Sequence, residues 1–195
     1  MELSPIARER LARIGQVSEE ERRRMQTKGE LEHILSEYYM GSADVEVLWQ
    51  HLKSLMDNHG PEVVSDAQKS IVGTMRLQMS EDDYGKRKEA LLALETLKKS
   101  GKYSAVEMLL GSITALRQRY DEVWRQAYDH VKAQLEGKIQ ESAEQARAQG
   151  MLVDTASTVD ASIKSSPEWR EFMSRHDASA QQTLHDYIDR LIELL

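Results

Sequence analysis

The clearest metal-ligand spacing in the sequence is Glu30-x-x-His33, which a helix would place on one face. Di-iron helical bundles use this Glu-x-x-His arrangement twice and add two further glutamates. Here no other histidine has a glutamate three residues before it, and His51 and His59 are two helical turns apart, too far to share an ion. The sequence therefore predicts no metal site and no cofactor.

Two His-Asp pairs, His176-Asp177 and His185-Asp186, are similar to the pair used by metal-dependent phosphohydrolases. Those enzymes also need a histidine on an earlier helix and a later aspartate around the same metal, whereas both pairs here lie in the last 20 residues. We interpret Asp177 as the N-cap of a last helix and Asp186 as part of its polar flank. We expect no hydrolase site.

Phosphate loops and activated nucleophiles are also missing from the sequence. The closest two glycines, Gly101 and Gly111, are ten residues apart, so neither a Walker loop nor a dinucleotide fingerprint can form. No serine lies in a Gly-x-Ser-x-Gly or Ser-x-x-Lys context. The chain has no cysteine, which removes thiol nucleophiles, disulfides and thiolate zinc sites. The sequence therefore predicts a protein that is not an enzyme.

The most specific surface feature is a basic N-terminal arm. Residues 1–28 carry seven basic and five acidic side chains, a balance of +2, which leaves −9 for the rest of a chain whose net charge is −7. The candidate partner contacts are the basic residues Arg8, Arg13, Arg22, Arg23, Arg24 and Lys28. Glutamates one turn earlier would neutralise part of this charge through the pairs Glu19–Arg23 and Glu20–Arg24. Two interpretations remain open: a self-paired, solvated helix, or a contact with a partner or with phosphates.

Helix signals organise the first half of the chain. Ser4-Pro5 and Gly15 bound a first helix, and a capping box of Ser18 with Glu21 begins a second that runs to Gly41. Ser42 is the expected cap of a third helix, Gly60-Pro61 separates it from a fourth, and Ser80 with Asp83 begins a fifth that ends near residue 98. Each of the second to fifth helices carries an apolar stripe at helical spacing, which predicts its buried face: Leu31, Ile34, Leu35 and Tyr38 in the second; Val45, Leu48, Trp49, Leu52, Leu55 and Met56 in the third; Val64, Ala67, Ile71 and Met75 in the fourth; and Tyr84, Leu91, Leu94 and Leu97 in the fifth.

Residues 104–149 contain no proline and no cluster of turn residues, which predicts one long helix of about 46 residues. Its apolar positions alternate in steps of three and four, typical of a coiled-coil seam: Val106, Leu109, Ile113, Leu116, Tyr120, Val123 and Ala127. The next members, Val131, Leu135 and Ile139, come in steps of four, an inserted stutter that locally unwinds a supercoil.

The C-terminal region is expected to consist of short helices. Residues 151–166 are rich in Ser, Thr, Ala and Asp, with a weak stripe that includes Val159 and Ile163. Ser166-Pro167 begins a short helix, and Asp177 begins a last one whose apolar stripe continues to Leu195. We expect that end to be docked on the protein or shared with a partner.

Composition agrees with these signals: 40% of the residues are hydrophobic, 30% are charged, and no strand-like runs occur. We predict an all-α, elongated multi-helix bundle with a basic arm (1–41), a helical bundle (42–150) and a region of short helices (151–195). The N-terminal residues do not resemble a signal peptide and no run reaches the length of a membrane span, so we expect a cytoplasmic protein without membrane contact.

The function predicted from the sequence is a non-enzymatic protein–protein interaction module: an adaptor, an assembly factor or a small regulatory subunit. Its partners would be proteins, including a second copy bound through the long helix. The alternative is an RNA- or ribosome-associated factor that contacts phosphates through the basic arm. The net charge of −7 ranks nucleic acid second, because attraction to phosphate is the main driver of such binding.

Overall fold

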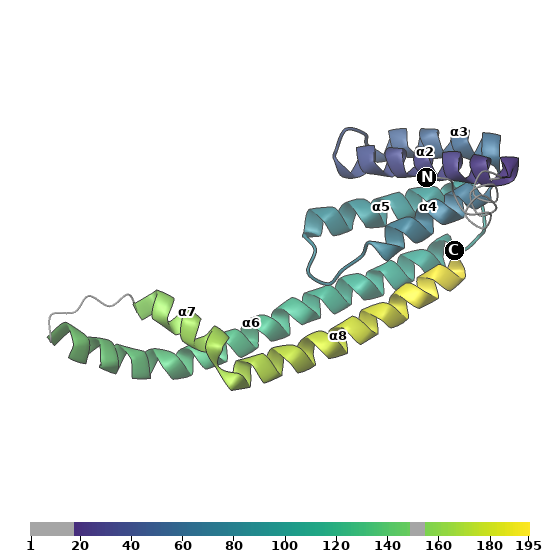
Figure 1. Cartoon of the computed structure of the whole chain (residues 1–195). Helices are drawn as coiled ribbons and strands as arrows, with labels where there is room; N and C mark the ends of the chain where they lie inside the picture. Colours follow the sequence, from purple (N-terminus) through teal and green to yellow (C-terminus); the bar gives the residue numbers. More distant parts are fainter. Residues whose placement is uncertain (1–17, 149–154) are drawn as a thin grey trace, which may run out of the picture. The chain divides into compact units, whose positions relative to one another are not determined.

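The computed structural model of the chain describes residues 18–148 and 155–195, and it leaves out the side chains of Glu20, 137–148 and 155–158 (Figure 1). All seven regular elements in these ranges are α-helices, which confirms the predicted all-α fold. They are α2 (Glu19–Tyr39), α3 (Val45–His59), α4 (Glu62–Gly73), α5 (Glu81–Lys98), α6 (Tyr103–Ala148), α7 (Thr155–Ser165) and α8 (Pro167–Leu194). The helix predicted at residues 4–14 lies outside the described residues.

The chain divides into two compact units. Of the described residues, the first contains 18–75, 80–104 and Leu195, and its helices are α2 to α5. The second contains residues 76–79, 105–148 and 155–194 and is built from α6, α7 and α8. No helix in the described parts of the chain is long and apolar enough to cross a membrane.

Helix α2 begins with the predicted capping box. The Glu21 backbone N–H donates to the Ser18 hydroxyl at 3.1 Å, and the Ser18 backbone N–H donates to the Glu21 carboxylate at 2.8 Å. These two hydrogen bonds give side-chain partners to backbone N–H groups at the start of the helix, which have no partner within the helix itself. The helix continues through Gly29 and ends at Tyr39, and Gly41 follows with a φ of 77°, in the left-handed region that favours glycine.

The predicted cap of α3 is wrong. Asp44, not Ser42, caps the helix, and its carboxylate accepts from the Val47 backbone N–H at 2.9 Å. The backbone N–H groups of Ser42 and Ala43 both donate to the Glu37 carbonyl, at 3.0 and 3.3 Å. Ser42 therefore belongs to the end of α2, because its backbone N–H donates to a carbonyl in the last turn of that helix.

The core of the first unit is mainly aliphatic. Helix α3 packs against α2, α4 and α5, and α4 also packs against α5. Nine apolar side chains in these helices are completely buried: Leu48, Leu52, Val64, Ala67, Ile71, Val72, Ala90, Leu91 and Leu94. All lie on the predicted apolar faces or directly beside them, so helical periodicity identified this core correctly.

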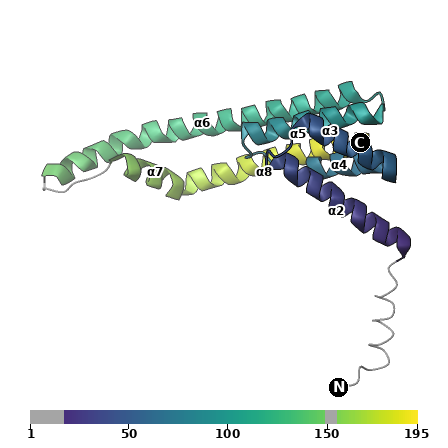
Figure 2. The ribbon, with the colours of Figure 1, turned by 90° about the horizontal axis from the view of Figure 1, so that it is seen from above.

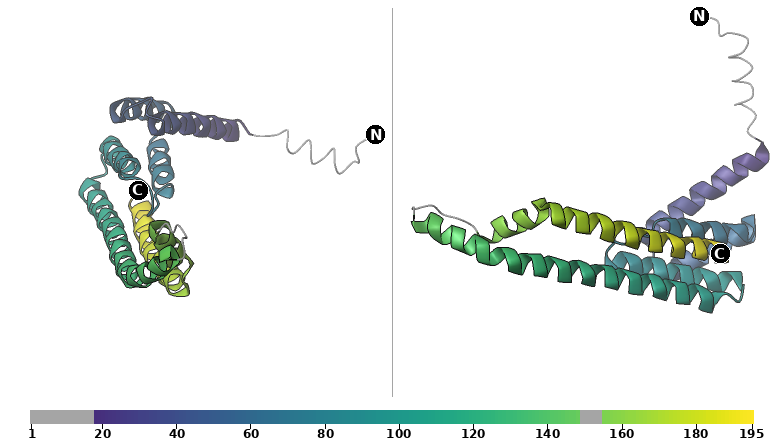
Figure 3. Two further views of the ribbon diagram at one scale, coloured as in Figure 1. Left: turned by 90° about the vertical axis from the view of Figure 1, so that its left-hand side faces the viewer. Right: turned by 90° about the horizontal axis from the view of Figure 1, so that it is seen from below.

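In the second unit, α6 and α8 lie side by side and antiparallel in all the views (Figures 2 and 3). Helix α6 begins one residue before the predicted start and ends one residue before the predicted end. Its described side chains stop at Glu136, so the predicted stutter residue Ile139 lies outside them. The polar, weakly apolar segment after residue 154 forms helix α7, where Val159 and Ile163 are buried as predicted.

The predicted seam of α6 is only partly confirmed: Val106, Ile113 and Tyr120 are buried as predicted, but the residues between them differ. The buried line is Val106, Leu110, Ile113, Arg117 and Tyr120, whereas the predicted members Leu109, Leu116 and Val123 are only half-buried. Both lines obey steps of three and four, so spacing alone could not choose between them. Arg117 is not among the predicted members, and a charged residue is seldom buried.

The predicted break at Asp177 is also wrong, since α8 is one helix of 28 residues. Asp177 lies in its interior and accepts a hydrogen bond from the Tyr120 hydroxyl at 2.7 Å. An aspartate favours helix starts because its side chain competes for backbone N–H groups. Here the carboxylate is occupied by a tertiary contact, and no glycine or proline follows Pro167 to stop the helix.

Candidate functional site

A groove of about 780 Å³ opens in the first unit between α2, the end of α3 and the beginning of α4. Three of the candidate partner contacts, Arg23, Arg24 and Lys28, line it from α2. Their spacing of one to five residues places them on neighbouring turns of the same helix. One wall of the groove is therefore basic and is formed by part of the predicted basic arm.

The opposite wall is acidic. Glu62 and Asp66 line the groove from α4, four residues apart and so on one helical face. Gly60, with φ of 97°, and Pro61 turn the chain from α3 into α4 and set where this wall begins. Glu62 lies in the first turn of α4, where a negative charge suits the helix dipole.

The charges of the two walls are not joined across the groove. No ion pair links Arg23 or Lys28 to Glu62 or Asp66, all of which are among the described residues. Lys28 instead lies 3.8 Å from Glu32 of its own helix, and both side chains are well exposed. Such exposed pairs contribute about 0–1 kcal/mol, so the charges remain available to a partner.

The floor of the groove is apolar. Leu31 and Val63 line it and are 6% and 5% exposed. Beside them, the Thr27 hydroxyl donates to the Arg23 carbonyl at 2.9 Å and lies 3.1 Å from Nδ1 of His59. The hydroxyl has one proton, so both hydrogen bonds form together only in the His59 tautomer that carries hydrogen on Nδ1. This contact ties α2 to the end of α3 at the edge of the groove.

The remaining predicted contacts are not gathered in the groove. Arg22 is exposed on α2 but does not line it, and Arg8 and Arg13 lie outside the described residues. The predicted pair Glu19–Arg23 does not form among the described ion pairs. The pair Glu20–Arg24 depends on the Glu20 side chain, which lies outside the described part of the chain.

The histidine motifs take part in pairwise contacts. His33 lies 3.6 Å from Glu37, and His185 lies 3.5 Å from Asp189. His176 stacks on Tyr120 with ring centroids 4.5 Å apart, and its Nε2 lies 3.0 Å from the Tyr120 carbonyl. In the parts of the chain that the structure describes, no three His, Asp or Glu side chains are grouped to hold a metal ion.

Sequence reasoning missed a buried polar cluster in the first unit. Gln68 and Glu95 are buried, and the Gln68 side-chain N–H donates to the Glu95 carboxylate at 3.1 Å. Nearby, the Lys98 ammonium and the Ser65 hydroxyl donate to the Leu195 carbonyl. Burial lowers the pKa of Lys98, and the charge of Glu95 opposes that shift. The sequence held one signal of this cluster: Glu95 directly follows Leu94, which lies on a buried face of α5.

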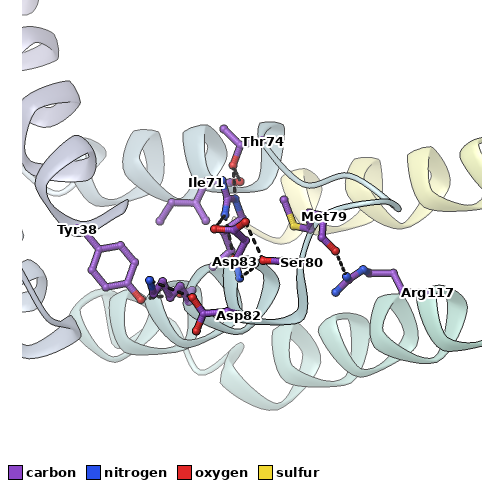
Figure 4. Close-up of polar contacts among 10 residues, drawn as sticks. Tyr38, Ile71, Thr74, Met79, Ser80, Asp82, Asp83 and Arg117 are labelled. Carbon is purple, nitrogen blue, oxygen red and sulfur yellow. Dashed lines mark hydrogen bonds and ion pairs between the residues drawn. The ribbon is translucent and has the colours of Figure 1, made fainter. Parts of the chain in front are cut away.

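Arg117 is the corresponding missed residue in the second unit. It is 3% exposed and donates to the carbonyls of Leu77 and Met79, which belong to the same unit. Figure 4 shows the contact with Met79. The neighbouring Gln78 donates to the Tyr120 hydroxyl at 2.7 Å. These contacts hold segment 76–79 on α6 through hydrogen bonds.

A second groove, of about 640 Å³, runs between α6 and α8. Leu116 and Val123 line it from α6, and Ala180 and Tyr187 line it from α8. Several of its other lining residues are small and hydroxylated: Ser112, Ser179 and Thr183. Small residues on facing helices let another helix approach closely, so this groove is a candidate contact for a further helix.

No curated protein and no solved structure matches the chain. A family model does match it over residues 49–195, from within α3 to Leu195. The match covers about three quarters of the chain and includes the acidic wall and the second groove, whereas α2 precedes it. The chain belongs to the family of unknown function DUF6657.

Proposed function

We propose that the protein is a non-enzymatic helical interaction module that binds another protein, as an adaptor, an assembly factor or a small regulatory subunit. The observation that carries the proposal is the groove in the first unit, with its apolar floor and its walls of opposite charge. Protein-binding surfaces have a polar and charged rim, and polar and charged side chains surround the two apolar residues of this groove. We also propose the cytoplasm as its location, on the sequence arguments alone.

The acidic wall favours a protein over a nucleic acid. A phosphate that approached Arg23 or Lys28 would lie across the groove from Glu62 and Asp66. Those carboxylates repel a phosphate, whereas a polypeptide can present both signs of charge to the two walls. The charge pattern therefore supports the interaction module rather than the RNA-associated alternative.

One observation supports the RNA-associated alternative: Arg22, Arg23 and Lys28 are exposed on α2. If they contact phosphates, RNA binding should weaken log-linearly with salt, by a slope of roughly 0.7–0.9 per contact. The triple charge reversal R22E, R23E and R24E should then abolish binding. We expect only feeble RNA binding at physiological ionic strength, with no effect of the triple variant, in a gel-shift assay.

The second groove is consistent with the expected self-association through the long helix. Leu116 and Val123 are half-buried at a spacing of seven residues on one flank of α6. A second copy that covered this flank would complete their burial. Light scattering over a range of protein concentrations tests this part of the proposal separately.

Site-specific photo-crosslinking in cells tests the main proposal. A photoreactive amino acid is placed at Asn58 or Ser70, both exposed and lining the first groove, and at Gln50, exposed on the polar face of α3, as the control. We expect the same protein to be captured from both groove positions and not from Gln50. Capture of RNA from the groove would favour the alternative, and equal capture at Gln50 would contradict the proposal.

A further inference from the structure

The two walls of the first groove place charges of opposite sign on opposite sides of an apolar floor. Arg23 and Lys28 stand on α2, Glu62 and Asp66 stand on α4, and no ion pair bridges them. Glu32, on α2 one turn after Lys28, offsets part of the positive charge at one end of the groove. The groove therefore has a basic wall and an acidic wall on opposite sides, with apolar side chains on the floor between them.

From this charge pattern we infer that the groove binds an amphipathic α-helix with an acidic flank facing α2 and a basic flank facing α4. The inference rests on the proposed function and specifies the partner at the same site. A helix presents an apolar stripe at i, i+3, i+4 and i+7, which would rest on Leu31 and Val63. Both side chains are already buried, so the charged walls, and not new apolar burial, carry the selectivity. Its two flanks then lie beside the two walls, where each charge finds an opposite one.

The same pattern fixes the direction in which the helix docks. Turning a helix end for end in a groove exchanges its two flanks. An acidic flank would then face Glu62 and Asp66, and a basic flank would face Arg23 and Lys28. Like charges in these positions are unfavourable, so one orientation is selected.

The inference excludes occupants that carry one sign of charge. A wholly acidic helix, or a phosphate chain, would satisfy α2 and be repelled by α4, and a wholly basic helix would do the reverse. The occupant therefore differs from a nucleic acid in a way that a binding assay can measure.

Three synthetic helical peptides of about 15 residues, stapled so that they are helical in water, provide the probes. All three carry the same leucine stripe, and their flanks are acidic and basic, both acidic, or both basic. Binding to the full chain is measured by fluorescence anisotropy. Since each exposed pair contributes a factor of up to about five and each wall offers two charges, we expect the mixed peptide to bind about tenfold tighter than either of the others.

Charge reversals in the protein should change the preference in opposite directions. R23E with K28E makes both walls acidic and should transfer the preference to the wholly basic peptide. E62K with D66K makes both walls basic and should transfer it to the wholly acidic peptide. The controls are Arg22→Glu on α2 and Glu46→Lys on α3, both exposed and outside the groove, which should leave the ranking unchanged.

The possible results separate this inference from the proposed function. Equal binding of the mixed and the wholly acidic peptides, or no measurable binding of any peptide, would overturn the inference. If crosslinking at Asn58 and Ser70 still captured a protein, the interaction module would stand with a different kind of partner. If both experiments failed, the proposed function would fall with the inference. The transfer of preference in both reversals is the result we expect.

Discussion

The helices of the two units are packed together by different kinds of contact. In the first unit α3 has three helical neighbours, and side chains such as Leu48, Leu52 and Ile71 are completely buried. In the second unit α6 has fewer helices around it, and many of its apolar side chains are only half-buried. Where aliphatic burial is incomplete, directional contacts between named side chains hold the helices in register.

The second unit shows these directional contacts along α6. Trp124 and Tyr128 stack at 5.2 Å, and Trp169 meets both rings edge-on at 5.9 and 5.8 Å. The Tyr128 hydroxyl donates to Asp160 of α7 at 2.8 Å, and the Tyr120 hydroxyl donates to Asp177 of α8. Aromatic and hydrogen-bonded pairs depend on geometry, so they select one alignment of the helices where general burial would allow several.

The largest effect is expected from the core of the first unit. Leu52→Ala removes a completely buried side chain from α3 and should lower the free energy of unfolding by about 3–5 kcal/mol. Urea denaturation followed by circular dichroism measures the change. Gln50→Ala, exposed on the same helix, is the control and should change stability by less than about 0.5 kcal/mol. A small effect at Leu52 would contradict the close packing of this unit.

A pair of variants on α6 tests the buried line of that helix in the second unit. Leu110→Ala should cost about 2–4 kcal/mol because Leu110 is completely buried, whereas Leu116→Ala should cost about 1 kcal/mol because Leu116 is half-buried. The measurement is again urea denaturation, at several protein concentrations. If Leu116 costs as much as Leu110 and the cost rises with concentration, a second copy covers the α6–α8 groove.

A smaller effect is expected from Tyr120→Phe. The change removes a hydroxyl that accepts from Gln78 and donates to Asp177, and it should cost about 1–2 kcal/mol. Tyr128→Phe should cost less, because Tyr128 is half-buried whereas Tyr120 is buried. Thermal unfolding of the two variants gives the ranking. The opposite order would show that the α7 contact, and not the α8 contact, dominates the second unit.

The smallest effect concerns stability at alkaline pH. Burial, and then the charge of Glu89, raise the pKa of Tyr38 above its ordinary value near 10. Above pH 10 the unfolded chain releases this proton before the folded protein does, so the free energy of unfolding falls as the pH rises. Tyr38→Phe should make that fall less steep, measured by denaturation between pH 9 and 11. An unchanged slope would contradict the contribution of Tyr38, which donates to the Lys86 carbonyl at 2.7 Å.

Local sequence determined the fold class and most helix starts. The capping signals at Ser18 and Ser80 act within one turn, so they do not depend on the rest of the molecule. Helical periodicity likewise identified Leu48, Leu52 and Ile71 as core, because a stripe of apolar residues has only one side to bury. These features depend on interactions between residues that are close together in the sequence, so they can be predicted from the sequence alone.

Only the tertiary structure decided which of two equivalent seams is buried on α6, and whether Asp177 caps a helix or lies within one. Leu109 and Leu110 are both apolar, and the choice between them depends on neighbours that periodicity does not specify. Asp177 remains inside α8 because its carboxylate meets Tyr120, a residue 57 positions away. The candidate groove arises in the same way. Arg23 and Glu62 line the same groove only because α2, α3 and α4 pack together. The two residues are far apart in the sequence, so no local pattern predicts that their charges lie on opposite walls.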